Sequence, residues 1–116
     1  MAGQAAEVRF FDDLPERAPA NRDLEVRLRR EGEDPARMYL NFRHTNQREG
    51  VYRKLEMRET DGTFSAVIPG EYLTPEWDLI VFFSGKSASG ETILYPGVTL
   101  DDFRTPYFVV RIDGEA

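Results

Sequence analysis

The chain contains no cysteine among its 116 residues, and it has only one histidine and one tryptophan. The lack of cysteine excludes disulfide bonds, thiol nucleophiles and cysteine-ligated zinc or iron–sulfur sites. No apolar run approaches the roughly 18 residues that a membrane-spanning helix needs. Helical periodicity is weak throughout the sequence. These absences remove several classes of enzyme and of membrane protein, so insertion into a membrane is not expected.

Basic residues are outnumbered, since 21 acidic residues stand against 15 basic ones and the formal net charge is −6. An acidic chain repels phosphate backbones, and the basic residues form no cluster beyond Arg29-Arg30. Binding to nucleic acid or to anionic membranes is therefore not expected. Hydrophobic residues make up 41% and charged residues 31%, as in a folded globular protein. At this length we expect one domain over residues 1–116, with polar ends at 1–6 and 113–116.

The first residues, Met1–Glu7, lack both the basic and the apolar region of a signal peptide. We therefore expect either a cytosolic chain or a segment of a longer exported protein, which would be extracytoplasmic. As an isolated domain the chain is expected to be a monomer.

Short alternating stretches separated by turn residues predict an all-β chain. The clearest is Asp23–Arg30, in which every second residue is apolar. Asp61-Gly62, between two alternating stretches, predicts a two-residue hairpin turn, because both positions favour φ above zero. Leu79–Phe83 is apolar throughout, which predicts a central strand covered on both faces. Ser84–Glu91, rich in Gly and Ser, predicts a hairpin loop.

Together these stretches predict a single antiparallel β-sandwich of about seven or eight strands. The expected strands are Val8–Phe11, Asp23–Arg30, Met38–Thr45, Tyr52–Glu59, Thr63–Pro69, Leu79–Phe83, Thr92–Tyr95 and Tyr107–Ile112. The inward positions of these strands define the expected core, which consists of Leu24, Val26, Leu28, Met38, Leu40, Phe42, Leu55, Met57, Phe64, Ile68, Leu79, Val81, Phe83 and Val109.

No pattern typical of catalysis is present. His44 ends a strand without the partners that a Ser-His-Asp or metal–histidine site requires. The pairs Asp12-Asp13 and Asp101-Asp102 lack the spacing of calcium loops, in which acidic residues alternate with others and a Gly marks the bend. The segment Gly85–Gly90 lacks the Lys-Ser/Thr that follows in a phosphate-binding loop. We expect no catalytic residue, no metal site and no cofactor.

Aromatic rings outside the inward pattern are the remaining candidates for binding. Sugars stack the C–H faces of their rings on exposed aromatic rings, while amide, carboxylate and guanidinium groups bind the hydroxyl groups. An alternative is that Trp77 closes one end of the core and that the tyrosines cap sheet edges through their hydroxyl groups. The candidate ligand-binding residues are Tyr39, Arg43, His44, Asn46, Gln47, Tyr52, Trp77 and Tyr95.

The order of several segments resembles a known family. Tyr39–His44, Tyr52–Met57, Asp61-Gly62, Phe64–Pro69 and Leu79–Phe83 are similar to the immunoglobulin-like, fibronectin-III-like or early-set sandwich modules attached to bacterial enzymes that act on polysaccharides. The resemblance covers roughly residues 37–112 and implies an immunoglobulin-like fold. It also implies a non-catalytic accessory module that holds domains apart, shields an enzyme or binds glycan. Its partner would be a polysaccharide or a neighbouring domain of a longer chain.

A structural or protein-interaction domain is the alternative function. In that case the edge strand Val8–Phe11, or the strand from Tyr107 onward, would pair with a partner. Exposed aromatic residues gathered on one sheet face would favour a glycan, whereas aromatic residues along an open strand edge would favour a protein partner.

Overall fold

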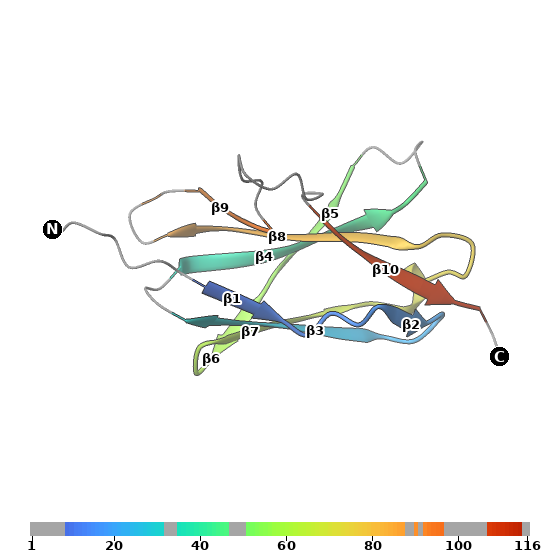
Figure 1. Cartoon of the computed structure of the whole chain (residues 1–116), viewed down its shortest axis with the longest axis horizontal. Coiled ribbons are helices and arrows are strands. Elements are labelled where there is room, and N and C mark those ends of the chain that lie inside the picture. The colour runs from blue at the N-terminus through green and yellow to red at the C-terminus, as the bar shows by residue number, and fades with distance from the viewer. Residues whose placement is uncertain are drawn as a thin grey trace, which may run out of the picture.

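The computed structural model describes residues 9–31, 35–46, 51–87, 90, 92–96 and 107–114, and over these residues the chain is all-β, as predicted (Figure 1). The polar end 1–6 lies outside the described residues, and Asp113 is the last residue of the final strand. A single 3-10 turn, η1 (Gly70–Tyr72), follows the seventh strand. The ten strands within the described ranges are β1 (Arg9–Asp12), β2 (Arg17–Pro19), β3 (Leu24–Glu31), β4 (Pro35–His44), β5 (Arg53–Glu56), β6 (Arg58–Thr60), β7 (Thr63–Ile68), β8 (Leu79–Ser87), β9 (Thr92–Tyr95) and β10 (Phe108–Asp113).

The strands form two sheets, which Figure 1 shows as two layers. The smaller sheet has the order β1-β3-β7-β6 and is antiparallel. The larger sheet has the order β2-β10-β8-β4-β5, and β9 also pairs with β8. Within the described strands every pair is antiparallel except β2 and β10, which run parallel. The prediction of antiparallel pairing therefore holds for all of these pairs but one.

In the order of its described strands the chain changes sheet five times, between β1 and β2, β2 and β3, β3 and β4, β5 and β6, and β7 and β8. β1 lies in the smaller sheet and β2 in the larger, while β5 lies in the larger sheet and β6 in the smaller. Figure 1 shows the ribbon from β5 to β6 crossing between the layers. Met57 lies at this crossing with its side chain 5% exposed, and its backbone N–H donates to the Met38 carbonyl oxygen at 2.9 Å. The single strand predicted over Tyr52–Glu59 is therefore two strands, one in each sheet.

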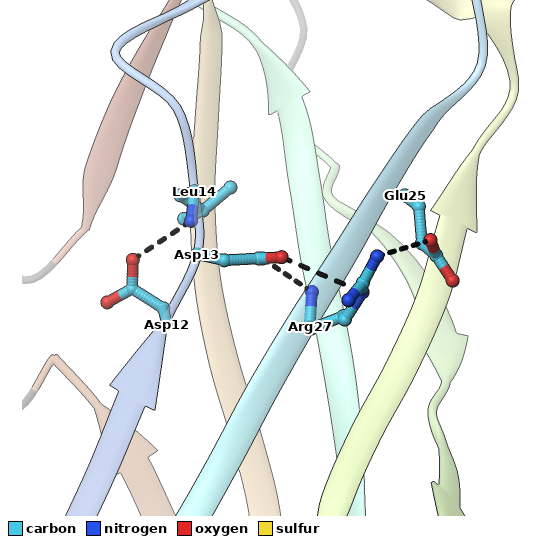
Figure 2. A network of polar contacts seen from close by, with 5 residues as sticks. All are labelled: Asp12, Asp13, Leu14, Glu25 and Arg27. Atoms are coloured by element: carbon cyan, nitrogen blue, oxygen red, sulfur yellow. Dashed lines mark hydrogen bonds and ion pairs between the residues drawn. The ribbon is translucent and has the colours of Figure 1, made fainter.

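Two carboxylates organise the first crossing, between β1 and β2 (Figure 2). Asp12 Oδ1 accepts a hydrogen bond from the Leu14 N–H at 3.2 Å, and Asp13 Oδ1 accepts one from the Arg27 N–H at 2.7 Å. The Arg27 guanidinium reaches both Asp13 Oδ2, at 3.8 Å, and Glu25 Oε1, at 3.2 Å. Side chains thus satisfy backbone N–H groups where β1 stops pairing with β3.

The core lies between the two sheets and contains the alternating residues that the sequence predicted, with one exception. Val109 is 49% exposed, and Val110, which is 0% exposed, takes the inward position. The pairing fixes this arrangement, because Val110 lies opposite the buried Leu79. The other expected core residues are buried or packed against the core; they are Leu24, Val26, Leu28, Met38, Leu40, Phe42, Leu55, Met57, Phe64, Ile68, Leu79, Val81 and Phe83.

The hairpin turn at Asp61-Gly62 is confirmed, with φ of 51° and 83° at its two residues. The central position of the Leu79–Phe83 strand is also confirmed, since β8 lies between β4 and β10. That strand continues to Ser87 and pairs there with β9, so the predicted loop from Ser84 begins too early.

The prediction of an open edge from Tyr107 onward is wrong. β10 pairs with β8 over Phe108–Val110 and with β2 over Arg111–Asp113, so it lies inside the larger sheet. β1, in contrast, lies at one end of the smaller sheet, where it pairs with β3 alone among the described strands.

Candidate functional site

The outward side chains of β4 and β5 form one continuous surface of the larger sheet. In this register Tyr39 lies opposite Glu56, and Asn41 lies opposite Lys54. β8 continues the surface on the other side of β4, with Phe82 opposite Asn41. We call the surface on β4 and β5 the β4–β5 face; it comprises Arg37, Tyr39, Asn41, Arg43, Tyr52, Lys54 and Glu56.

Two aromatic rings meet above β4 on this face. The ring centroids of Tyr52 and Phe82 are 4.9 Å apart, and the ring planes meet at 81°, which is an edge-to-face contact. β5 and β8 flank β4 on opposite sides, and neighbouring strands lie about 4.8 Å apart, so the two side chains reach toward each other over β4. Asn41 is only 5% exposed, although it points away from the core. The two rings help to bury it.

Asn41 has a fixed orientation in this position. Its Nδ2 donates to the Ser84 Oγ at 2.9 Å and lies 3.4 Å from the carbonyl oxygens of Tyr39 and Phe82. A buried amide is costly unless it is hydrogen-bonded, and these contacts meet that requirement. At the centre of the face, the side chain of Asn41 is therefore held in one orientation beneath the rings of Tyr52 and Phe82.

Cations lie over both tyrosine rings of the face. The Arg43 Cζ is 5.2 Å from the centroid of the Tyr52 ring, and the Lys54 Nζ is 4.5 Å from that of the Tyr39 ring. Contacts of this kind contribute about 0.5–1 kcal/mol at exposed sites. The rings and the cations therefore restrict one another's rotamers before any ligand arrives.

Hydrogen bonds restrict the cationic side chains of the face further. The Arg43 Nη1 donates to the carbonyl oxygens of His44, at 3.1 Å, and Asn46, at 3.3 Å. Arg37 hydrogen-bonds with Tyr39, and this bond is the main cause that raises the pKa of Arg37 above its ordinary value. Electrostatic interactions with Tyr39 and Glu56 raise the pKa of Arg37 further.

A groove of about 510 Å³ lies beside this face, between β5 and η1. At the groove, the Tyr72 ring stacks on His44 with centroids 4.0 Å apart, and the Arg53 Cζ is 4.9 Å from the Tyr72 centroid. The His44 Nε2 also lies 2.7 Å from the Tyr72 carbonyl oxygen. The ring of Tyr72 is thus engaged by side chains of its own chain. The residues that line the groove are Phe42, Arg53, Lys54, Leu55, Pro69, Glu71 and Tyr72.

The structure brings together part of the set of residues that the sequence singled out. Tyr39, Arg43 and Tyr52 share the β4–β5 face, and Asn46 joins them through the carbonyl oxygen that accepts from Arg43. His44 belongs to the inward side of β4, opposite Leu79, and contacts the groove instead. Gln47 lies outside the described residues.

The last two candidates lie elsewhere. Trp77 precedes β8 and is 40% exposed. The Tyr95 ring packs against the rings of Phe10, Phe83 and Phe108, with centroids 5.5–5.9 Å apart. Its hydroxyl group donates to Asp12 Oδ2 at 2.9 Å. Tyr95 therefore joins β9 to β1 at the margin of the core, and it is not part of the β4–β5 face.

Sequence reasoning missed Lys54 and Phe82. Lys54 follows Tyr52 by two residues, so the alternation that placed Tyr52 outward also places Lys54 outward. Phe82 could not be found in this way, because its contact with Tyr52 depends on the order in which β5, β4 and β8 pair.

No protein-family model matches the chain, and a search of curated proteins finds no match. Among the described residues, no three His, Asp or Glu side chains are grouped so that they could hold a metal ion. None of the helical segments in the described ranges is long and apolar enough to cross a membrane.

Proposed function

We propose that the chain is a non-catalytic accessory module of a polysaccharide-acting protein, with an immunoglobulin-like fold, and that its β4–β5 face binds carbohydrate. The observation that carries the proposal is the ordered pair of rings, Tyr39 and Tyr52, on one outward sheet face. The cationic donors Arg43 and Lys54 lie beside them, and the buried Asn41 lies between them on the same face.

The strand order supports the immunoglobulin-like part of the proposal. In that fold one sheet has the order A-B-E-D, and the other contains G-F-C, to which variable-type domains add C′. The order β1-β3-β7-β6 corresponds to A-B-E-D, and β10-β8-β4-β5 corresponds to G-F-C-C′. The chain order of these strands is then that of the immunoglobulin fold, with β2 added between A and B and β9 added between F and G.

The spacing of the rings suits a polymer. Tyr39 lies opposite Glu56, and Tyr52, directly before β5, precedes Glu56 by four residues. At about 3.3 Å per residue, the backbone positions of the two tyrosines lie about 13 Å apart along the strands. Different sugar units of one chain would therefore contact the two rings, while the guanidinium of Arg43 and the ammonium of Lys54 donate to hydroxyl groups between them.

The restricted rotamers of the aromatic side chains on the β4–β5 face reduce the entropic cost of binding. Tyr39 and Tyr52 are half-buried and held by cations, and tyrosine has only two side-chain torsions to immobilise. A ligand that contacts these rings therefore meets side chains whose rotamers are already restricted.

The test is retention of the protein on a panel of immobilised polysaccharides, with two matched variants. Tyr52→Leu removes the ring from the β4–β5 face. Phe11→Leu removes a ring from the outer face of the smaller sheet, where Phe11 is 45% exposed and the Arg29 Cζ lies 5.0 Å from its centroid. Circular dichroism and thermal unfolding establish that each variant folds.

We expect the unmodified protein and Phe11→Leu to bind the same polysaccharide equally. We expect Tyr52→Leu to bind about fivefold more weakly, since an aromatic contact contributes about 1 kcal/mol. A folded protein that binds no polysaccharide, or an equal loss in both variants, would contradict the proposal.

The open edge of β1 favours a second candidate function, the pairing of this domain with a protein partner. β1 lies at the end of the smaller sheet, and Phe11 is exposed on it. A strand of a neighbouring domain would add to this edge through backbone hydrogen bonds. In that case Phe11→Leu weakens the association with the neighbouring domain and Tyr52→Leu leaves it unchanged, so the same variants separate the two functions.

A further inference from the structure

The outer face of the larger sheet has a charge opposite in sign to that of the chain. The chain as a whole carries a formal net charge of −6. On the outward positions of this sheet, basic side chains outnumber acidic ones by six to two. The basic residues are Arg17, Arg37, Arg43, Lys54, Lys86 and Arg111, and the acidic ones are Glu56 and Asp113.

Two of the cations on the outer faces are ion-paired. On the larger sheet Arg17 lies 3.4 Å from Asp113. On the smaller sheet the guanidinium of Arg27 lies between the carboxylates of Asp13 and Glu25 (Figure 2). An anion that approaches Arg27 is therefore repelled by two carboxylates as well as attracted. On the β4–β5 face, Lys54 and Arg43 instead contact the rings of Tyr39 and Tyr52.

Cations and rings succeed one another along the β4–β5 face. Arg37, Tyr39 and Arg43 occupy outward positions of β4, and Lys54 lies opposite Asn41 between the last two. At about 3.3 Å per residue, Arg37 and Arg43 lie about 20 Å apart along the strand. A linear polymer lying along β4 would meet positive charge at both ends of this length and near its middle.

We infer that the face selects an acidic polysaccharide, one whose sugar units carry carboxylate groups; the inference rests on the proposed function. Carboxylates repeated along the polymer match the series of cations, and the sugar rings between them meet Tyr39 and Tyr52. Nucleic acid is a poorer match, because its charge density is high and the chain as a whole is acidic.

The test compares polygalacturonate with the same polymer after chemical reduction of its carboxyl groups. The two differ in charge while the sugar backbone is retained. We expect the full chain to bind polygalacturonate and to bind the reduced polymer at least tenfold more weakly. We also expect binding to weaken between 50 and 300 mM salt, because the Debye length falls below about 10 Å over this range.

Matched charge variants locate the interaction. Lys54→Gln and Arg37→Gln each remove one exposed cation from the face, and each should weaken binding to polygalacturonate about two- to fivefold. Arg58→Gln removes an exposed cation from the outer side of β6 in the other sheet, with the same change in net charge, and should leave binding unchanged.

Each alternative outcome has a definite meaning. Equal binding of the native and the reduced polymer would overturn the inference and leave carbohydrate binding intact. Equal affinity for polyglutamate, a polyanion without sugars, would also overturn the inference. It would show that the face binds polyanions through charge alone and does not recognise an acidic sugar. A folded chain that binds none of the polysaccharides would overturn both this inference and the proposed function.

Discussion

The pairing of Gly85 on β8 with Met38 on β4 gives a sharp prediction. Gly85 is buried, and a Cβ added there would overlap the carbonyl oxygen of Arg37 and the Sδ of Met38. The Met38 side chain is 0% exposed, so it has little room to move, and the carbonyl group belongs to the β4 backbone. Gly85→Ala should therefore displace the start of β4, next to the β4–β5 face.

The size of the effect follows from two opposing terms. Overpacking of a core position costs about 1–3 kcal/mol. Replacing glycine by alanine also restricts the unfolded chain, which offsets about 0.5 kcal/mol of that cost. We therefore expect Gly85→Ala to lower the free energy of unfolding by about 0.5–2.5 kcal/mol. For a domain of this size that corresponds to a fall in Tm of about 2–10 °C.

Urea and thermal unfolding, followed by circular dichroism, measure the change. Gly114→Ala is the matched control, since its added Cβ would meet only the Pro75 Cβ at an ordinary contact distance of 3.6 Å. We expect that control to stay within about 0.5 kcal/mol of the unmodified protein. If Gly85→Ala were as stable as Gly114→Ala, the tight contact between β4 and β8 would be refuted.

Three further substitutions test one contact between the two sheets and two features within the smaller sheet. Tyr95→Phe removes the hydroxyl group that donates to Asp12 and should lower the free energy of unfolding by about 1 kcal/mol in urea denaturation; no change would show that the bond is not stabilising. Glu59→Gln removes the carboxylate paired with Arg30, whose side chain is 14% exposed, and should cost about 1–2 kcal/mol in the same assay, whereas a neutral result would contradict a stabilising ion pair. Gly62→Ala should lower Tm through a cost of about 1 kcal/mol, because Gly62 has a φ of 83°; an unchanged Tm would show that the turn relaxes.

Alternation predicted which side chains face the core but not which sheet each strand joins. Leu55, at the inward side of β5, and Met57 both pack in the core, although the chain leaves the larger sheet between β5 and β6. Both sheets face the same core, so a residue two positions further on still points inward after the crossing. The change of sheet does not alter the alternation of apolar and polar residues. The sequence therefore predicted β5 and β6 as one strand.

The error at Val109 has a different cause. The residues from Tyr107 to Val110 are all apolar, so both alternating sets fit a core-facing pattern. The polar residue Arg111 carries the deciding signal, because it shares a face with Val109. Giving more weight to the polar end of the strand would have placed Val110 in the core.

For the candidate site, alternation was sufficient to place Tyr39 and Arg43 on the outward side of one strand. The contact between Tyr52 and Phe82 needed the pairing order of three strands, which a single sequence does not state. The net charge of the whole chain did not predict the charge of this face. The chain is acidic, but cations predominate on the outer face of its larger sheet.

The most direct test of the account is to map the binding surface by NMR during titration with an oligosaccharide of galacturonate. We predict that the amide resonances that shift lie in β4, β5 and the middle of β8, over residues 37–43, 52–56 and 82–84. We predict no shifts in β1, β3 or β7 of the smaller sheet. Shifts confined to the smaller sheet or to the groove beside η1, or none at all at saturating ligand, would contradict the assignment of the β4–β5 face.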